Sequence, residues 1–268
     1  MRTFLLAASL FLVPLAAQAA DGARIGIGAE TSSGRYGTQS TTRIDSVPVT
    51  LIGSRGAWSV KASVPWVRVQ GDANVVPGVG PVSNLNPLGR GRIGLPIIDP
   101  PPGAQPVPQR GRASGVGDLR LATTYTVAGD KTGIGVTANA KIATADADKG
   151  LGTGANDYGA ALDAYRNVGT ATVFGGVGYT RFGRSPHIDV DDAANANVGA
   201  SVAAGRGRVG MQLDWREAVA RGSEERRDAT GFYSRPVGAA TEVQVFASKG
   251  MTDAGPDWGA GVGLSIGF

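Results

Sequence analysis

The sequence predicts an all-β fold, a single transmembrane antiparallel up-and-down β-barrel of about twelve strands that follows a cleaved signal peptide. Three observations predict it. The last twelve residues, Asp257 to Phe268, alternate between apolar and small or polar side chains without exception, as a strand with two different faces does. The apolar face carries an aromatic residue at each end, Trp258 and Phe268, which is typical of strands that cross a bilayer. Segments of this kind recur along the chain, and the connections between them are alternately long and short.

The first twenty residues have the three parts of a secretory signal peptide. Met1 and Arg2 supply the positive start, Phe4 to Leu15 is apolar, and small residues around Ala19 form a cleavage site. A membrane helix is the alternative, but the apolar run is shorter than the ~20 residues that a helical span needs. We therefore expect residues 1–20 to be removed and residues 21–268 to form the barrel.

The composition agrees with a closed sheet and excludes several classes of protein. The mean hydropathy is −0.04, as expected where apolar and polar residues alternate, and the chain has 42 glycines, which suit closely approaching strands. Cysteine is absent, so there is no disulfide framework, and one histidine cannot build a Cys/His metal cluster. A net charge of +4 is too small to predict a nucleic-acid partner. We predict no cofactor.

Period-2 alternation places the expected strands. They are Arg24–Glu30, Arg43–Ile52, Trp58–Val69, Gly117–Val127, Ile134–Ile142, Asn156–Arg166, Ala171–Phe182, Ala194–Ala204, Val209–Trp215, Ala229–Val237, Glu242–Ser248 and Trp258–Phe268. A bulge is expected at Pro65, because the alternation slips there and proline cannot donate to a ladder. Residues 218–228 read as a charged loop, and the pattern does not decide which of Phe232 and Tyr233 faces outward. A soluble β-sandwich is the alternative fold, but it does not explain the alternation of long and short connections.

One long irregular stretch, Gly71 to Ala113, interrupts the pattern and contains nine of the fifteen prolines. By its place in the alternation it is an extracellular loop. A loop of this length is usually functional or disordered. It could fold inward as a constriction or remain a mobile surface loop, and the sequence does not decide between these.

Polarity decides which face of each strand meets lipid. If the strand around Lys141 were shifted by one residue, that cation would face hydrocarbon at a cost of about 2–4 kcal/mol. The polar face is therefore the lumen. The expected lumen-lining residues are Arg24, Glu30, Lys61, Asp118, Arg120, Lys141, Asp157, Asp163, Arg208, Asp214, Arg216 and Glu242. Such balanced charges either pair across the wall and hold it rigid, or form a narrow charged eyelet that sorts solutes. Asp118 is expected near Arg120 or Lys141, and Asp157 is a candidate partner for Lys141.

Three segments resemble an outer-membrane family named for the meta-cleavage pathway of phenol degradation. They are Gly115-Val116-Gly117-Asp118-Leu119, then Lys141 to Thr144 with Leu151-Gly152-Thr153-Gly154, and Phe174 to Tyr179. Residues Ile142 to Ala145 replace the proline and glycine of that family's second segment. The resemblance implies a barrel proposed to act as a transporter or channel, often encoded near genes for aromatic degradation. It brings no catalytic residues.

Together these observations predict a non-enzymatic barrel in the outer membrane of a Gram-negative bacterium. We expect passive diffusion of small solutes, with aromatic or hydrophobic compounds as one class, through a narrow charged lumen. Lipid is one expected partner, and barrel-assembly machinery is another, through the strand that ends at Phe268. The alternatives are a lipid hydrolase, for which Ser185-Pro186-His187 is a weak signal, and a structural or adhesive barrel without transport.

Overall fold

The computed structural model describes residues 21–84, 110–186, 188–220 and 222–268. The expected signal peptide and residues 85–109 of the long loop lie outside this part of the chain. Twelve antiparallel strands form the barrel, as predicted. They are β1 (Gly22–Gly34), β2 (Thr42–Arg55), β3 (Trp58–Asp72), β8 (Leu119–Ala128), β9 (Thr132–Ile142), β10 (Asp157–Val168), β11 (Ala171–Arg181), β13 (Ala193–Ala204), β14 (Gly207–Arg216), β15 (Arg226–Pro236), β16 (Thr241–Gly250) and β17 (Trp258–Gly267). None of the described residues belongs to a helix long and apolar enough to cross a membrane.

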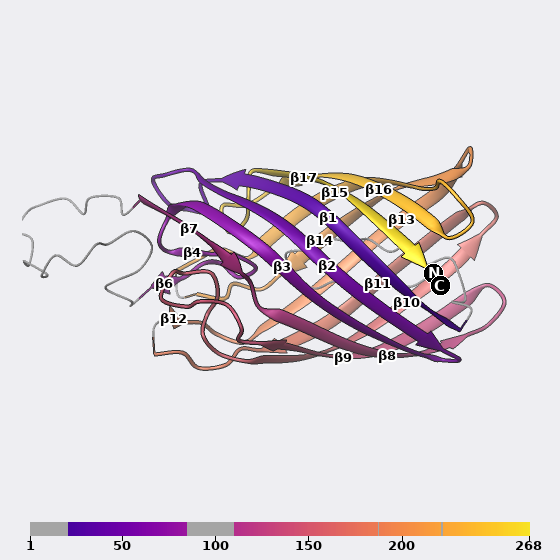
Figure 1. The fold of residues 1–268 in the computed structure, drawn as a ribbon, viewed down its shortest axis with the longest axis horizontal. Helices are drawn as coiled ribbons and strands as arrows, with labels where there is room; N and C mark the ends of the chain where they lie inside the picture. The colour runs from indigo at the N-terminus through magenta and orange to yellow at the C-terminus, as the bar shows by residue number, and fades with distance from the viewer. Residues whose placement is uncertain (1–20, 85–109, 187, 221) are drawn as a thin grey trace, which may run out of the picture.

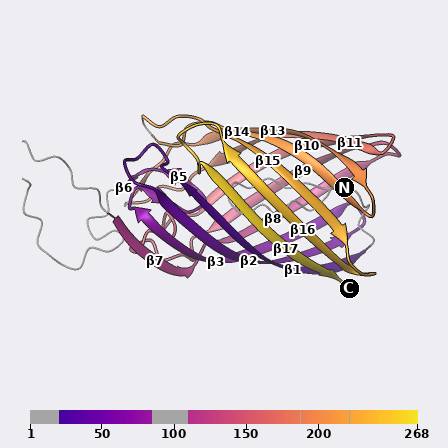
Figure 2. The same cartoon turned by 90° about the horizontal axis from the view of Figure 1, so that it is seen from above.

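The barrel closes between its first and last strands (Figures 1 and 2). β1 and β17 pair in one continuous register, from Arg24 opposite Gly267 to Ser33 opposite Trp258. Beyond the last pair, Ala23 and Phe268 exchange two backbone hydrogen bonds, of 3.4 and 2.8 Å. Closure matters because a bilayer offers no water to an unpaired backbone group.

The connections alternate between the two ends of the barrel. Residues 56–57, 129–131, 169–170, 205–206 and 237–240 form short turns at one end, which we call the turn end. The other connections are longer and lie at the opposite end, which we call the loop end. In bacterial barrels short turns face the periplasm and longer loops face outward.

The outward face is apolar and ends in aromatic rings on both sides. Trp58 and Tyr125 lie near the turn end with ring centroids 4.9 Å apart. Trp66 and Trp258 lie on the outward face nearer the loop end, and Trp258 is 47% exposed. Between these levels many apolar side chains are exposed, including Ile27, Leu51, Val60, Val136, Leu162, Val177, Val198, Met211, Val245 and Val262. This is the lipid-facing pattern that the sequence predicts.

The bulge lies opposite Pro65, on the neighbouring strand. The side chains of β3 alternate through Pro65, and the β2–β3 register is continuous. On the other side, β3 pairs with β8 up to Arg120 and then with β7 (Arg110–Val116), with a shift of one residue. The extra residue lies at Gly117–Leu119, where Gly117 donates to the Pro65 carbonyl at 2.8 Å. The expected bulge in β3 was therefore wrong, because the partner strand adjusts to the proline.

Two expected loops are shorter than the sequence suggests. Residues 71–72 belong to β3 and residues 110–113 to β7, so both ends of the long loop 71–113 are strand. Similarly, β15 begins at Arg226 and not after the charged segment 218–228. In β15 the charged residues Arg226 and Asp228 continue the inward face of the strand. Phe232 is buried inside and Tyr233 is the outer residue of that pair.

Candidate functional site

A short hairpin from the long loop folds into the loop end of the barrel. We call residues 73–82 the inner hairpin. Strand β4 (Val75–Val76) pairs with β5 (Gly80–Pro81), and the Val79 amide donates to the Val76 carbonyl at 3.1 Å. Pro77 and Gly78 occupy the centre of this turn, and Gly78 has a φ of +83°, as a type II turn requires. The Val82 amide donates to the Asn74 carbonyl at 2.7 Å and closes the base.

Apolar packing and one arginine hold the inner hairpin in place. Three of its four valines, Val76, Val79 and Val82, are at most 5% exposed and pack with Ile188, Ala193 and Val219 from other loop-end segments. Nη2 of Arg216 donates to the Val79 carbonyl at 2.5 Å. Directly after the hairpin, β6 (Ser83–Asn84) pairs with β12 (Ile188–Asp189). The described part of the long loop is therefore folded against the barrel mouth.

The inner hairpin separates three cavities. An outer cavity of about 600 Å³ is lined by Pro81 and Val82 together with the loop residues Tyr36 and Glu224. Two smaller cavities, of about 130 and 120 Å³, lie deeper, and Pro77 and Gly78 line both of them. The inner hairpin therefore lies between the outer cavity and the two deeper ones.

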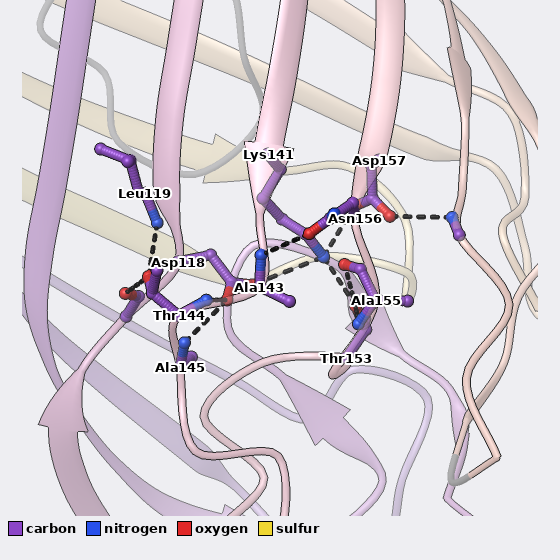
Figure 3. Close-up of polar contacts among 12 residues, drawn as sticks. Asp118, Leu119, Lys141, Ala143, Thr144, Ala145, Thr153, Ala155, Asn156 and Asp157 are labelled. Atoms are coloured by element: carbon purple, nitrogen blue, oxygen red, sulfur yellow. Dashed lines mark hydrogen bonds and ion pairs between the residues drawn. The ribbon is translucent and has the colours of Figure 1, made fainter.

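Lys141 forms the centre of a buried ionic cluster at the wall of this region (Figure 3). Its Nζ lies 2.7 Å from Oδ2 of Asp157 and 3.4 Å from Oδ2 of Asp118, and it donates to Oγ1 of Thr153 at 2.6 Å. The three charged side chains are 7–10% exposed. The expected pairing of Lys141 with Asp157 is confirmed, and Asp118 lies beside Lys141.

The two carboxylates of this cluster also hold the backbone of the loops. Oδ1 of Asp118 accepts hydrogen bonds from the amides of Thr144 and Ala145 at 3.2 and 3.0 Å, and Oδ1 of Asp157 accepts one from Gly183 at 3.0 Å. Such bonds stabilise the charged form of a carboxylate. The cluster thus fixes the start of the loop 143–156 onto the wall.

Two of the three segments that carry the family resemblance, around Gly117 and around Lys141 to Gly154, meet at this cluster. A Cβ on Gly117 would lie 2.8 Å from the Pro65 ring, and one on Gly152 would lie 2.8 Å from Oδ2 of Asp118. Leu151 is buried against Val69 and Ala113. These segments therefore serve to pack the loop 143–156 against the strand break at Gly117.

The other charged residues predicted for the lumen occupy several levels. Arg24 and Glu242 form an ion pair of 3.3 Å, and Glu30 lies within electrostatic reach of Lys61 and Arg120. Arg208 donates to Ser201 and Thr172. Asp163 lies opposite Gly176 in the β10–β11 ladder, and its carboxylate occupies the space that a Cβ on Gly176 would need. Arg120, Lys141, Asp157, Asp214 and Arg216 line the first inner cavity, while Glu30, Asp118 and Arg120 line the second.

The hairpin tip and two charged residues of the site, Arg226 and Asp228, were not predicted from the sequence. Pro77-Gly78 between valines is a turn signal with a mechanism, and it could have placed a hairpin within the long loop. Arg226 and Asp228 form an ion pair of 2.5 Å and both line the first cavity. The sequence predicts a charged loop for the segment 218–228, which contains them. Within the described residues no group of three or more metal-binding side chains is found.

Comparison with solved structures identifies the fold. The barrel is similar to the translocator domain of the autotransporter NalP from Neisseria meningitidis, with a TM-score of 0.53 and 11% identity over 94% of this chain and 90% of that one. It is also similar to the KdgM porin (TM-score 0.52, 9% identity, 91% and 99% of the chains). The β domain of the Bordetella autotransporter Brka is a third neighbour (TM-score 0.51, 15% identity, 92% and 100%). This chain has the fold of an outer-membrane β-barrel.

These neighbours show the fold, and they comprise one porin and two autotransporter domains. Fold alone does not decide function. No protein-family model matches the chain, and no curated sequence matches it. The resemblance to the phenol-degradation family therefore stays a prediction.

Proposed function

We propose that this outer-membrane barrel is a passive channel for small solutes, and that the inner hairpin is its constriction. The observation that carries the proposal is the position of Pro77 and Gly78 between the outer cavity and the two inner ones. A hairpin held by buried valines and by Arg216 gives a fixed narrow passage, because these contacts leave it few alternative positions. The porin among the structural neighbours is consistent with a channel.

The charged residues predicted from the sequence would line this passage. Those that are ion-paired, such as Lys141 with Asp157, shape the wall, and the others set the field that a solute meets. The inner cavities of about 130 and 120 Å³ resemble in size an engineered apolar cavity of roughly 150 Å³ that binds benzene. Solutes of that size are the class we propose.

Aromatic or hydrophobic compounds are the finer class that the family resemblance implies. One observation favours them: the second cavity is lined by Ile44, Val67, Leu151 and Phe246 as well as by charged groups. A compact apolar ring would find dispersion contacts on that side.

The test is to remove the constriction. In a variant with residues 75–81 replaced by two glycines, the single-channel conductance of the refolded barrel in planar bilayers is expected to rise several-fold. The variant Lys149→Met, which alters an exposed loop-end charge, is the control and should conduct like the parent. Benzoate and benzyl alcohol, in a swelling assay with proteoliposomes, test the aromatic class.

Two results would contradict the proposal. A parent barrel that is sealed and stays sealed without the hairpin indicates a structural or adhesive role. A sealed barrel that turns over lipid indicates the hydrolase alternative, whose candidate base His187 lies outside the described residues.

A further inference from the structure

The β14–β15 ladder stacks like charges opposite one another at the constriction. Asp214 lies opposite Asp228, and the next inward pair is Arg216 opposite Arg226. Like charges placed directly across a ladder destabilise a sheet. Two such pairs in succession create two acidic groups on the side toward the turn end and two cationic groups on the side toward the loop end.

The four residues are only partly neutralised by each other. Arg226 pairs with Asp228 at 2.5 Å, whereas Arg216 donates to the Val79 carbonyl and Oδ1 of Asp214 accepts from Gln212 at 2.6 Å. Within the described part of the chain, Oδ2 of Asp214 and Nε of Arg216 are buried without a hydrogen-bond partner. A buried polar atom without a partner is costly, and such atoms mark places where a ligand or water completes the site.

These groups share one cavity. Asp214, Arg216, Arg226, Asp228 and Thr230 all line the first inner cavity of about 130 Å³, beside the hairpin tip. Thr230 is fully buried, and its Oγ1 also has no partner among the described residues. Two residues that line this cavity therefore each carry a buried polar atom without a partner: an acceptor on Asp214 at its acidic side, and a donor on Arg216 at its basic side.

We propose that this cavity binds small zwitterions, compounds of amino-acid size that carry one carboxylate and one ammonium group. The carboxylate lies toward Arg216 and Arg226, and the ammonium lies toward Asp214 and Asp228, with Thr230 beside them. The inference rests on the proposed channel function and names the substrate class of the first inner cavity, whereas the aromatic class proposed above concerns the second cavity. Because the site lies inside the barrel wall, its ligand is a free solute.

The arrangement of charges discriminates between solute classes. A simple anion at the arginines lies next to two carboxylates, and a simple cation at the carboxylates lies next to two guanidinium groups. Only a solute whose own charges are separated in the same direction gains at both ends without a nearby repulsion. A neutral solute of equal size gains neither charge-assisted hydrogen bond.

The experiment combines binding and passage, with probes of matched size. Calorimetric titration of the detergent-solubilised barrel uses β-alanine, propionate, propylamine and propanol, and proteoliposome swelling uses β-alanine and the uncharged propionamide. We expect β-alanine to bind about tenfold tighter than the two monoions and to pass several-fold faster than propionamide. Asp214→Asn and Arg216→Gln should each remove that preference, while the turn-end variants Asp130→Asn and Arg206→Gln should keep it. Heat-modifiable migration on gels verifies that each variant folds.

The outcomes separate the inference from the channel function. If β-alanine binds in preference but no solute passes, the zwitterion site stands and the channel function fails. If propionamide passes and β-alanine has no advantage in binding or passage, the channel function stands and the inference is overturned. It is also overturned if the preference for β-alanine survives in both Asp214→Asn and Arg216→Gln.

Discussion

The two halves of the barrel interior are built in different ways. Toward the turn end, hydroxyl pairs join adjacent strands, such as Thr124 with Thr137 at 2.9 Å, and aromatic rings lie over glycines of the neighbouring strand. Toward the loop end, the interior holds the ion cluster of Lys141 and the inner hairpin. The first half consists of strand side chains alone, while the second also contains segments that fold back from the loops.

This difference decides what each half can do. Neighbouring side chains in the turn-end half are fixed by the strand register, so that half mainly holds the shape of the barrel. The loop-end half contains charges, cavities and a hairpin that belongs to no barrel strand, so its shape depends on how loops are anchored. Under the proposed channel function, the loop-end half would select solutes.

The largest expected effect comes from breaking the ion cluster. Lys141→Met leaves Asp118 and Asp157 buried without their cation, and removing one partner of a buried pair typically costs about 3–5 kcal/mol. Urea unfolding of the refolded barrel in detergent measures this loss. Lys149→Met is the matched control, because the Lys149–Asp146 pair is exposed and its loss should not change the unfolding midpoint measurably. Equal midpoints for the two variants would contradict a structural role for the cluster.

A smaller loss is expected in the turn-end half from filling a glycine position. A Cβ on Gly210 would lie 2.4 Å from the Phe232 ring and 2.8 Å from the Ala200 carbonyl, so Gly210→Ala should cost about 1–3 kcal/mol through overpacking. The control is Gly231→Ala, since a Cβ there meets no atom within 4 Å. Combining Gly210→Ala with Phe232→Leu, which replaces the ring with a smaller side chain, should restore part of the lost stability. If Gly210→Ala unfolds at the same urea concentration as Gly231→Ala, the packing of the Phe232 ring on Gly210 does not contribute to stability.

The strands of the barrel could largely be predicted from the sequence. Alternation fixes which side chains face lipid, because a shift of one residue exchanges the two faces of a strand. It therefore located twelve strands and the pairing of Lys141 with Asp157 on adjacent strands. It could not locate the bulge, because the proline that causes it lies on one strand and the adjustment lies on the other, at Gly117.

The contacts inside the loop-end half were harder to predict from the sequence. Val76 and Val79 are buried by residues far away in the chain, such as Ile188 and Val219, and no local pattern reveals such contacts. Phe232 and Tyr233 are adjacent and both aromatic, so only the register of β15 could decide that Phe232 lies inside. The charged start of β15 looked like a loop because it continues an inward polar face beyond the level of the apolar outward residues.

The smallest expected effect is the titration of an exposed carboxyl on the loop that the ion cluster anchors. A hydrogen bond from Lys149 holds the pKa of Asp146 below its usual value. A depressed pKa means that this interaction contributes above the ordinary pKa of an aspartate and is lost as the pH falls through the folded value. Carbon-13 NMR of the Asp146 carboxyl in detergent micelles should show its titration at a higher pH in Lys149→Met than in the parent, while Arg206→Gln should leave it unchanged. This shift tests whether the loop is ordered beyond its attachment at Asp118. If the Asp146 carboxyl titrates identically in the parent and in Lys149→Met, the loop tip does not hold Lys149 beside Asp146.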